Sequence, residues 1–361
     1  EEQYAADAGV EFAIWSLLND PAFRSQVDNN SGSPQSLALP APVNGLDPTL
    51  TVTGLPLGTW SPRQPIPADV DSGGDLVYTG GNLLYALRGG NTKQFYRYSI
   101  SSDSWTALQN TPEIVKSSGN LAYSGGNSIY AFLTNKGQGN ESDFFRYNIS
   151  SDSWSKLEPT PKKLGNSTAL VAVGGNYLYA IPDKQQAFWR YDIGSDSWSS
   201  LATLPGKPGE GTSLIAYDSN TLFALEGNGT GFWRYTISSD SWTTRASTPG
   251  TVKGGGSLAY HSGPSIYAFQ GGTTAFWRYD VTINSWTVLS SAPAPTGDGG
   301  SLAFTSSETG FALRGGSTTT FWEFNVTQPQ YDITSQTGSN QIDSRLEISP
   351  ADHQILFWEI H

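Results

Sequence analysis

The side chains that could carry out acid–base, nucleophilic or metal chemistry are few in this 361-residue chain. It has no cysteine, so it can form neither a disulfide nor a thiolate. Only three histidines occur, His261, His353 and His361, so a zinc site built from His and Cys is not expected. No motif selects a pair of opposed carboxylates from the 32 acidic residues, and the GxxxxGK phosphate loop is missing. The sequence therefore predicts a protein without catalytic residues, metal or cofactor.

A ligand-binding site is predicted instead at one variable position of an internal repeat. An aromatic residue followed by alanine recurs six times, and the residue two after that alanine changes from copy to copy. Strand alternation places it on the side of the small alanine, near a strand end, where specificity can vary without disturbing the packing. These residues are Arg88, Leu133, Pro182, Glu226, Gln270 and Arg314. Loop residues expected around the same opening are Lys116, Lys163, Glu210, Lys253 and Asp298. The alternative is a set of solvated strand-end residues without a ligand.

The repeat behind these positions predicts four-stranded sheets. Its first aromatic anchor recurs every 44 to 49 residues, a period typical of propeller blades and solenoids. Each copy contains a short apolar run, an aromatic–alanine run, a run such as FWRY, and a run that begins at a tryptophan. Four short antiparallel strands make one blade, so the expected fold is mainly β, a six-bladed propeller. The anchors are Tyr96, Phe145, Trp189, Trp233, Trp277 and Trp322.

The smaller features of the repeat are expected to be structural. Glycine pairs between the first two strands suit hairpin turns that need a positive φ, and the aromatic rings should pack between blades. The Asp or Asn before each second tryptophan suits side-chain-to-backbone bonds in a turn, and the FWRY arginine should stack on a ring or pair with an acid. The glycine pairs are Gly80-Gly81, Gly125-Gly126 and Gly174-Gly175. The turn residues are Asp103, Asp152, Asp196, Asp240 and Asn284, and the arginines are Arg97, Arg146, Arg190, Arg234 and Arg278, with Glu323 in the last copy.

The order of the strands predicts how the propeller closes. No Ser-Trp strand follows Trp322, yet a matching strand, GTWSPRQPIP, stands before the first copy with Trp60 in the tryptophan place. We expect the strand around Trp60 to complete the sixth blade. Joining the two ends in this way removes the exposed sheet edge of an open ring.

From about Gly58 to Thr327 the sequence resembles kelch-type propellers, through its aromatic anchor, its later tryptophan and its glycine pairs. Those pairs are Gly89-Gly90, Gly271-Gly272 and Gly315-Gly316, whereas three copies depart from the pattern with Thr134-Asn135, Asp183-Lys184 and Gly227-Asn228. Copper oxidases built on this fold use a cysteine crosslinked to tyrosine, and the absence of cysteine leaves no such centre here.

The segments on either side of the repeat predict a small α+β unit. EEQYAADAGVEFAIWSLLNDP has helical spacing of apolar residues and ends at Asp20-Pro21. The C-terminal stretch divides into three strand-like runs at Gly338-Ser339-Asn340 and Pro350-Ala351-Asp352. Alternation in the middle run predicts one buried sheet face, made by Ile342, Leu346 and Ile348. The helix stripe expected to cover that face is Tyr4, Ala8, Phe12, Trp15 and Leu18.

This split unit resembles the pilin-like proteins of type IV pilus systems. YAADAGVEFAIWSLL is similar to the point where the helix of certain minor pilins leaves the membrane, and YDITSQTGSNQIDSRLEI with ILFWEI is similar to their terminal strands. The resemblance implies a leader and an apolar segment upstream, and it gives three regions: residues 1–56 as helix and linker, 57–327 as the propeller, and 328–361 as the C-terminal strands. Membrane contact is expected only through that upstream segment.

Composition and charge favour an extracellular, cell-surface or pilus location. A net charge of −12 argues against a nucleic-acid partner, because phosphate binding needs a basic face. Six Asn-X-Ser/Thr triplets are possible glycosylation sites if the host modifies exported proteins. They begin at Asn29, Asn140, Asn148, Asn166, Asn228 and Asn325.

Two functions follow from these observations. The favoured one is a non-enzymatic subunit of a surface filament that displays the propeller for adhesion or binding, with other pilin-like subunits and surface glycans as partners. The alternative is a secreted carbohydrate-active or carbohydrate-binding propeller whose terminal segments are only a cap.

Overall fold

Strands make up most of the regular structure in the computed structural model, which describes residues 1–29, 32–134, 139–182, 185–306, 308–348 and 353–361. Asp183-Lys184, Pro350-Ala351-Asp352 and Asn135 therefore lie, wholly or in part, outside the described residues. The chain divides into two compact units. The propeller unit contains Trp60–Trp286 and Ser291–Asn325, and the terminal unit contains Glu1–Thr59, Thr287–Ser290 and Val326–His361.

The propeller unit is built from four-stranded antiparallel sheets, six of them in the described residues. Three are β4 (Asp75–Tyr78), β5 (Leu83–Leu87), β6 (Phe95–Ser99) and β7 (Ser104–Ala107); β8 (Asn120–Tyr123), β9 (Ser128–Phe132), β10 (Phe144–Asn148) and β11 (Ser153–Leu157); and β12 (Ala169–Val173), β13 (Tyr177–Ile181), β14 (Trp189–Asp192) and β15 (Ser197–Ser200). Two more are β16 (Ser213–Ala216), β17 (Thr221–Leu225), β18 (Phe232–Thr236) and β19 (Ser241–Thr244); and β20 (Ser257–Ala259), β21 (Ser265–Phe269), β22 (Phe276–Asp280) and β23 (Ser285–Val288). The last is β24 (Ser301–Phe304), β25 (Thr309–Leu313), β26 (Phe321–Asn325) and β3 (Thr59–Pro62).

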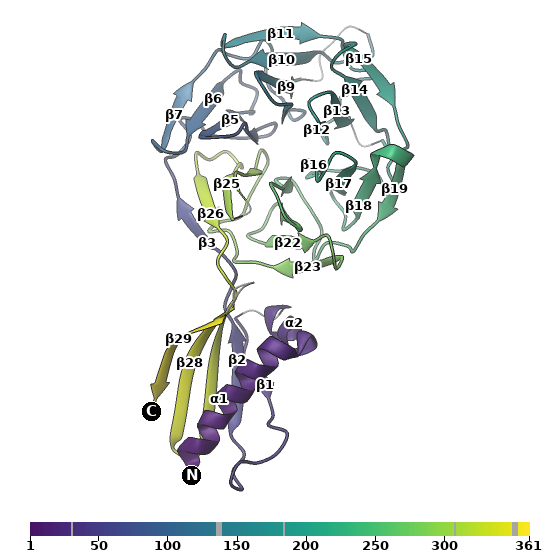
Figure 1. The fold of residues 1–361 in the computed structure, drawn as a ribbon. Coiled ribbons are helices and arrows are strands. Elements are labelled where there is room, and N and C mark those ends of the chain that lie inside the picture. Colours follow the sequence, from purple (N-terminus) through teal and green to yellow (C-terminus); the bar gives the residue numbers. More distant parts are fainter. Residues whose placement is uncertain (30–31, 135–138, 183–184, 307, 349–352) are drawn as a thin grey trace. The chain divides into compact units, whose positions relative to one another are not determined.

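These sheets surround a common axis as a β-propeller (Figure 1). Their first strands contact one another in the closed order β4, β8, β12, β16, β20, β24 and back to β4. The first strand of each sheet is therefore innermost. The predicted hairpins are confirmed, because both residues of Gly80-Gly81, Gly125-Gly126 and Gly174-Gly175 have a positive φ.

Aromatic rings fill every junction between neighbouring sheets, as the repeat predicted. At one junction the ring of Phe95 lies 4.9 Å from Tyr147 and 5.2 Å from Trp154, between ring centroids. The same trio recurs around the propeller with centroid distances of 4.7–5.2 Å. Edge-to-face contacts at this separation add to the stability that burial of the rings supplies.

The Asp and Asn turn residues bond to the backbone of the neighbouring sheet, whereas the sequence predicted bonds within the turn. The carboxylate of Asp152 accepts a bond from the hydroxyl of Tyr147 in its own sheet and another from the backbone N–H of Gln109 in the preceding sheet. The indole N–H of Trp154 donates to the carbonyl of the same Gln109. Asp103, Asp196, Asp240 and Asn284 repeat this arrangement, each at positive φ. The motif therefore joins neighbouring sheets.

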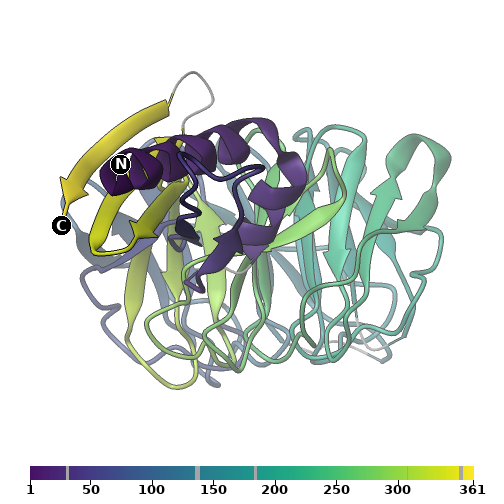
Figure 2. The same ribbon diagram turned by 90° about the horizontal axis from the view of Figure 1, so that it is seen from below.

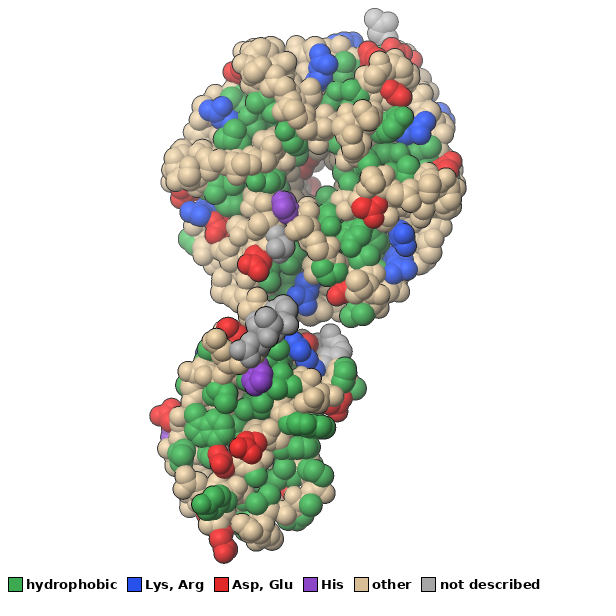
Figure 3. Space-filling model, viewed as in Figure 1, with side chains coloured by type: hydrophobic (Ala, Val, Ile, Leu, Met, Phe, Trp, Pro, Cys, Tyr) green, Lys and Arg blue, Asp and Glu red, His purple; other side chains and the backbone are tan. Residues whose placement is uncertain are grey.

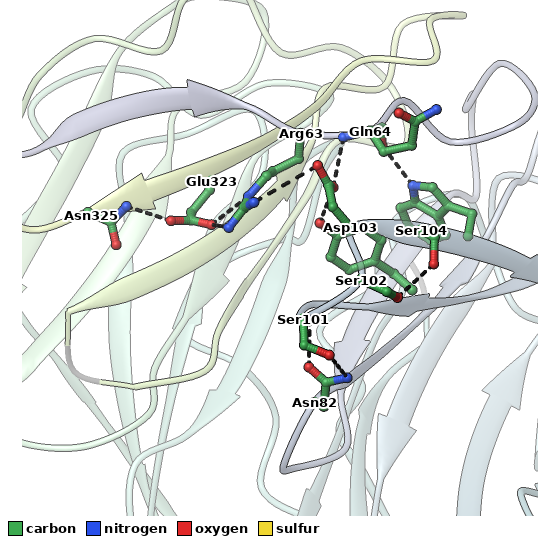
Figure 4. A network of polar contacts seen from close by, with 11 residues as sticks. Arg63, Gln64, Asn82, Ser101, Ser102, Asp103, Ser104, Glu323 and Asn325 are labelled. Atoms are coloured by element: carbon green, nitrogen blue, oxygen red, sulfur yellow. Dashed lines mark hydrogen bonds and ion pairs between the residues drawn. The ribbon is translucent and has the colours of Figure 1, made fainter.

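The strand around Trp60 occupies the place predicted from the sequence. β3 is the outermost strand beside β26, and the indole of Trp60 contacts the rings of Phe276 and Phe324 at 5.1 and 4.8 Å. Arg63, which directly follows β3, forms an ion pair with Glu323. Its Nη1 atom lies 3.9 Å from Oδ2 of Asp103 in the next sheet (Figure 4). The charge reversal at Glu323 thus serves the joint where the two ends of the propeller sequence meet.

The terminal unit is an α-helix packed on a five-stranded antiparallel sheet (Figures 1 and 2). The sheet order is β1 (Gln35–Leu37), β2 (Thr49–Gly54), β27 (Gln330–Thr337), β28 (Asn340–Ile348) and β29 (His353–Ile360). The sequence predicts the three C-terminal strands, but β1 and β2 lie in the segment that it predicts to be a linker. Burial of Ile342, Leu346 and Ile348 on one face of β28 is confirmed.

The N-terminal helix ends at the predicted place but begins again. α1 (Glu2–Asn19) stops before Asp20, and α2 (Pro21–Asn29) follows at once. Asp20 starts the second helix, because its side chain accepts bonds from the N–H groups of Ala22 and Phe23. Pro21 suits the first helical position, where no backbone donor is needed. The sequence pattern predicts only the end of a helix at this proline, and not the start of the next.

The face of α1 that packs on the sheet differs from the predicted one. Ala6, Val10, Ala13 and Leu17 are buried against β2, β27 and β28, and Gly9 lets the helix approach the sheet closely. The expected stripe is not the buried face: Tyr4 is 73%, Trp15 56% and Leu18 37% exposed, and Ala8 and Phe12 are half-buried. Large rings would hold the helix away from the sheet, whereas the row of small residues allows close packing.

Candidate functional site

The six residues predicted to form an axial opening do not line the cavities at the propeller centre. They lie at the ends of second strands, one layer away from the axis. Leu133 and Pro182 are buried. The four polar residues bond to nearby loop residues: Arg88 with Asp69 and Gln94, Glu226 with Gly231, Gln270 with Thr251, and Arg314 with Pro295. The prediction of an axial opening is therefore corrected, because strand alternation does not show how far a strand lies from the axis.

A polar cavity of about 460 Å³ opens at the axial end where the first strands begin. Three of the predicted loop residues, Lys116, Glu210 and Asp298, line it, whereas Lys163 and Lys253 are exposed outside it. Partial burial and the nearby charges of Glu210 and Asp71 raise the pKa of Asp298.

A second cavity, of about 570 Å³ and lined by aromatic rings, adjoins the polar cavity along the propeller axis. The space-filling view shows the hollow at the centre of the propeller (Figure 3). The wall of this aromatic cavity comes from all six first strands, and Tyr217 and His261 also line it. One aligned strand position, two residues after the first-strand leucine, sets the character of the wall. Around the ring it is occupied by Tyr78, Tyr123, Ala172, Ala216, Tyr260 and Phe304. The cavity is therefore ringed by aromatics on one side and by alanines on the other.

The two cavities meet at a ring of polar side chains that we call the waist. It is formed by Asp75, Asn120, Ser213, Ser257 and Ser301, which line both cavities. Waist side chains satisfy the inward-facing N–H groups of neighbouring first strands, which have no ladder partner. The N–H groups of Leu258, Leu302, Leu76 and Leu121 donate to the side chains of Ser213, Ser257, Ser301 and Asp75, at 2.7–3.2 Å. Aligning the copies on the first-strand leucine, rather than on the later alanine, would have shown this ring in the sequence.

Asp75 is the one carboxylate in the waist. It accepts bonds from the N–H groups of Leu76 and Leu121 and from the hydroxyl of Ser301. Burial nevertheless outweighs these bonds and raises the pKa of Asp75 from 3.8 to about 6. The folded state therefore holds the proton of Asp75 more tightly than the unfolded state does.

Replacing Asp75 with serine, the residue of three other sheets, should make the protein more stable at neutral pH. Because the pKa of Asp75 is raised in the folded state, the ionised side chain lowers the stability of the fold. This loss of stability is absent below about pH 4 and grows until the pH passes about 6. The pKa shift corresponds to about 3 kcal/mol. Because water in the two cavities screens the charge, we expect Asp75→Ser to raise the free energy of unfolding by about 2 kcal/mol at pH 7.5. Urea unfolding of the wild type and Asp75→Ser at pH 4 and pH 7.5 measures this difference. A stability difference that does not change with pH would contradict it.

The possible glycosylation sites differ in how available their side chains are. Asn140 and Asn228 are exposed, and the side chain of Asn29 lies outside the described residues. Asn148, Asn166 and Asn325 accept bonds from Asn127, Ser117 and Thr309 respectively, so modifying them would displace a partner.

Within the described residues, no three His, Cys, Asp or Glu side chains are placed to hold a metal ion. Among the described helices, none is both long and apolar enough to span a membrane.

Comparison with known proteins supports the fold and nothing more specific. No family model matches the chain, and no curated protein matches it. The solved structure of YjhT is similar with a TM-score of 0.57 at 15% identity, over 76% of this chain and 100% of that one. A structural genomics protein of unknown function from Bacteroides thetaiotaomicron is similar with a TM-score of 0.54 at 13% identity, over 82% of this chain and 83% of that one. At these identities the likeness shows a β-propeller fold alone.

Proposed function

We propose that this protein is a non-enzymatic subunit of an extracellular, pilus-like surface filament, and that it displays its propeller for adhesion or ligand binding. In this proposal the six four-stranded sheets are the blades of a kelch-type propeller inserted into a pilin-like unit. The partners are other pilin-like subunits, bound through α1, and surface glycans bound by the propeller.

The observation that carries the filament proposal is the second apolar face of α1. The helix buries one face on its own sheet, yet Tyr4, Phe12, Trp15 and Leu18 form a further row on its outer side. Phe12 and Trp15 are stacked with ring centroids 6.1 Å apart. The same side carries the exposed Glu11, but large exposed aromatic surfaces mark interaction sites. Helices from neighbouring subunits would cover this row in a filament core.

A single charge in this row should block assembly without unfolding the subunit. Trp15 is 56% exposed, so Trp15→Glu should leave the unfolding midpoint of the isolated protein nearly unchanged. A carboxylate buried between helices is costly, so incorporation into filaments should fall about tenfold or more. The measurement is the amount of the protein in filaments purified from producing cells.

Ile283→Glu is the matched control, because it places the same charge at a 71% exposed apolar residue of the propeller. Its incorporation should equal that of the wild type. The filament proposal is wrong if Trp15→Glu is incorporated normally, or if a filament reconstruction places α1 on the outside.

A secreted carbohydrate-binding or carbohydrate-active propeller remains the second candidate. The aromatic cavity favours it, because ligand sites are mostly concave, apolar and equipped with a few polar groups. The gene upstream of Glu1 separates the two: a short basic leader followed by about 20 apolar residues supports the filament, and a plain signal peptide supports the secreted protein.

A further inference from the structure

We propose that the aromatic cavity binds the end of a neutral oligosaccharide. This inference rests on the proposed function, in which the propeller binds a ligand, and it names the site and the chemical class of that ligand. The volume of about 570 Å³ is within the range of small-molecule sites, and its lining combines rings with polar groups.

The tyrosines of the wall present their rings, and not their hydroxyls, to the cavity, and the ring of Tyr260 also contacts that of Tyr217 with centroids 4.8 Å apart. The hydroxyl groups of Tyr78, Tyr123 and Tyr260 donate to the carbonyl oxygens of Gly81, Gly126 and Gly263 in their hairpin turns, at 3.1–3.2 Å. The rings are thus held at both ends, and each is only half-buried. A pyranose presents a face of C–H groups that stacks on such a ring, while its hydroxyls point sideways.

The break in sixfold symmetry provides the space in which a sugar could lie. On β12 and β16 the aligned wall position is Ala172 or Ala216, where the other four first strands carry a ring. Gly174, which has no side chain, lines the cavity beside Ala172. The alanine side therefore leaves more room than the tyrosine side for a sugar ring.

The waist supplies hydrogen-bonding groups at the bottom of the cavity. The hydroxyl oxygens of Ser213 and Ser257 accept backbone N–H bonds, and each hydroxyl retains a proton that it can donate to a ligand. Asp75 offers carboxylate oxygens beside them. Sugar hydroxyls both donate and accept, so this mixture of groups suits them.

The charges around the cavity select against an acidic sugar. Asp75 and Asp218 line it, and no Lys or Arg is among its described lining residues. The net charge of the chain is −12, which would further repel a carboxylate or sulfate. The site therefore suits a neutral carbohydrate.

The test uses the purified protein on an array of neutral, sialylated and sulfated oligosaccharides, with saturation-transfer NMR on the ligands retained. We expect neutral oligosaccharides to bind. Removing one stacking ring, in Tyr123→Ala or Tyr260→Ala, should weaken that binding about tenfold. Ala216→Tyr should abolish it, because the new ring fills the open side.

Each variant has a control that makes the same change away from the cavity. Tyr4→Ala removes an exposed tyrosine from α1, and Thr243→Tyr adds a ring to an exposed position of β19. Both should bind like the wild type, and the unfolding midpoint of every variant is measured alongside. Tyr260→Ala and Ala216→Tyr change the cavity in opposite ways, so a folding defect in one leaves the other informative.

No retention of neutral sugars, equal binding by the cavity variants, or binding of acidic sugars only would each overturn this inference. Filament assembly is read separately through Trp15→Glu. Sugar binding by a protein that does not assemble would leave the cavity inference standing and remove only the filament role.

Discussion

Gly73→Ala should destabilise the propeller by about 3 kcal/mol or more, seen as a lower midpoint in chemical unfolding. Gly73 has a φ of +81°, and a Cβ built on it would overlap the carbonyl oxygen of Lys116 in the next sheet. That carbonyl cannot move easily, because it also accepts the N–H of Gly119 in a tight turn. The same approach recurs at Gly211, Gly255 and Gly299, so these loops fit together around the axis.

Gly263→Ala separates the cost of the overlap from the cost of the backbone conformation. Gly263 has a similar φ of +77°, but no atom lies within 4 Å of the position where its Cβ would be. It should lose only the 1–2 kcal/mol, roughly, of a left-handed non-glycine residue. Equal losses in the two variants would show that the loops do not pack as described.

Trp60→Ala should open the joint that closes the propeller. The indole contacts Phe269, Phe276, Trp322 and Phe324, with ring centroids 4.8–5.9 Å apart. Removing it should cost about 3 kcal/mol, because a large aromatic is lost from a packed junction. Hydrogen exchange should rise in β3 and β26, whose pairing joins segments distant in sequence.

Trp154→Ala is the matched comparison, because Trp154 has the same place in a sheet made from one continuous segment. We expect a similar loss of stability, but its β11 is held beside β10 by a short turn, so exchange there should rise less. Closure by β3 is contradicted if exchange at residues 59–62 stays at the wild-type rate in Trp60→Ala.

The cavity at the propeller axis was only partly predictable. The aligned variation at Arg88 and its equivalents was real, but those residues belong to second strands, and the axis is lined by first strands. The residues that matter, such as Asp75 and Tyr260, were visible in the sequence at aligned positions. The local sequence does not distinguish a polar residue at the start of a strand that faces the axial cavities from one that faces solvent. That difference depends on the neighbouring sheets.

The buried face of α1 was also not predictable from the sequence. Two apolar rows run along it, one with Val10 and Leu17 and one with Tyr4 and Trp15, and hydrophobic spacing alone cannot choose between them. The row that contains Gly9 and the alanines is the buried one, because its small side chains allow the helix backbone to pack closely against β2 and β27.

By itself, the sequence determined the four-stranded sheets, their hairpins and the place of the strand around Trp60. Those features depend on short-range alternation, on turn residues and on a repeat that needs only its neighbours for packing. Only the tertiary structure decided which strand faces the axis, which row of α1 stays exposed, and that Asp75 stands among serines in the waist. These depend on contacts between segments far apart in the chain, where burial and steric fit act on groups that the sequence leaves equivalent.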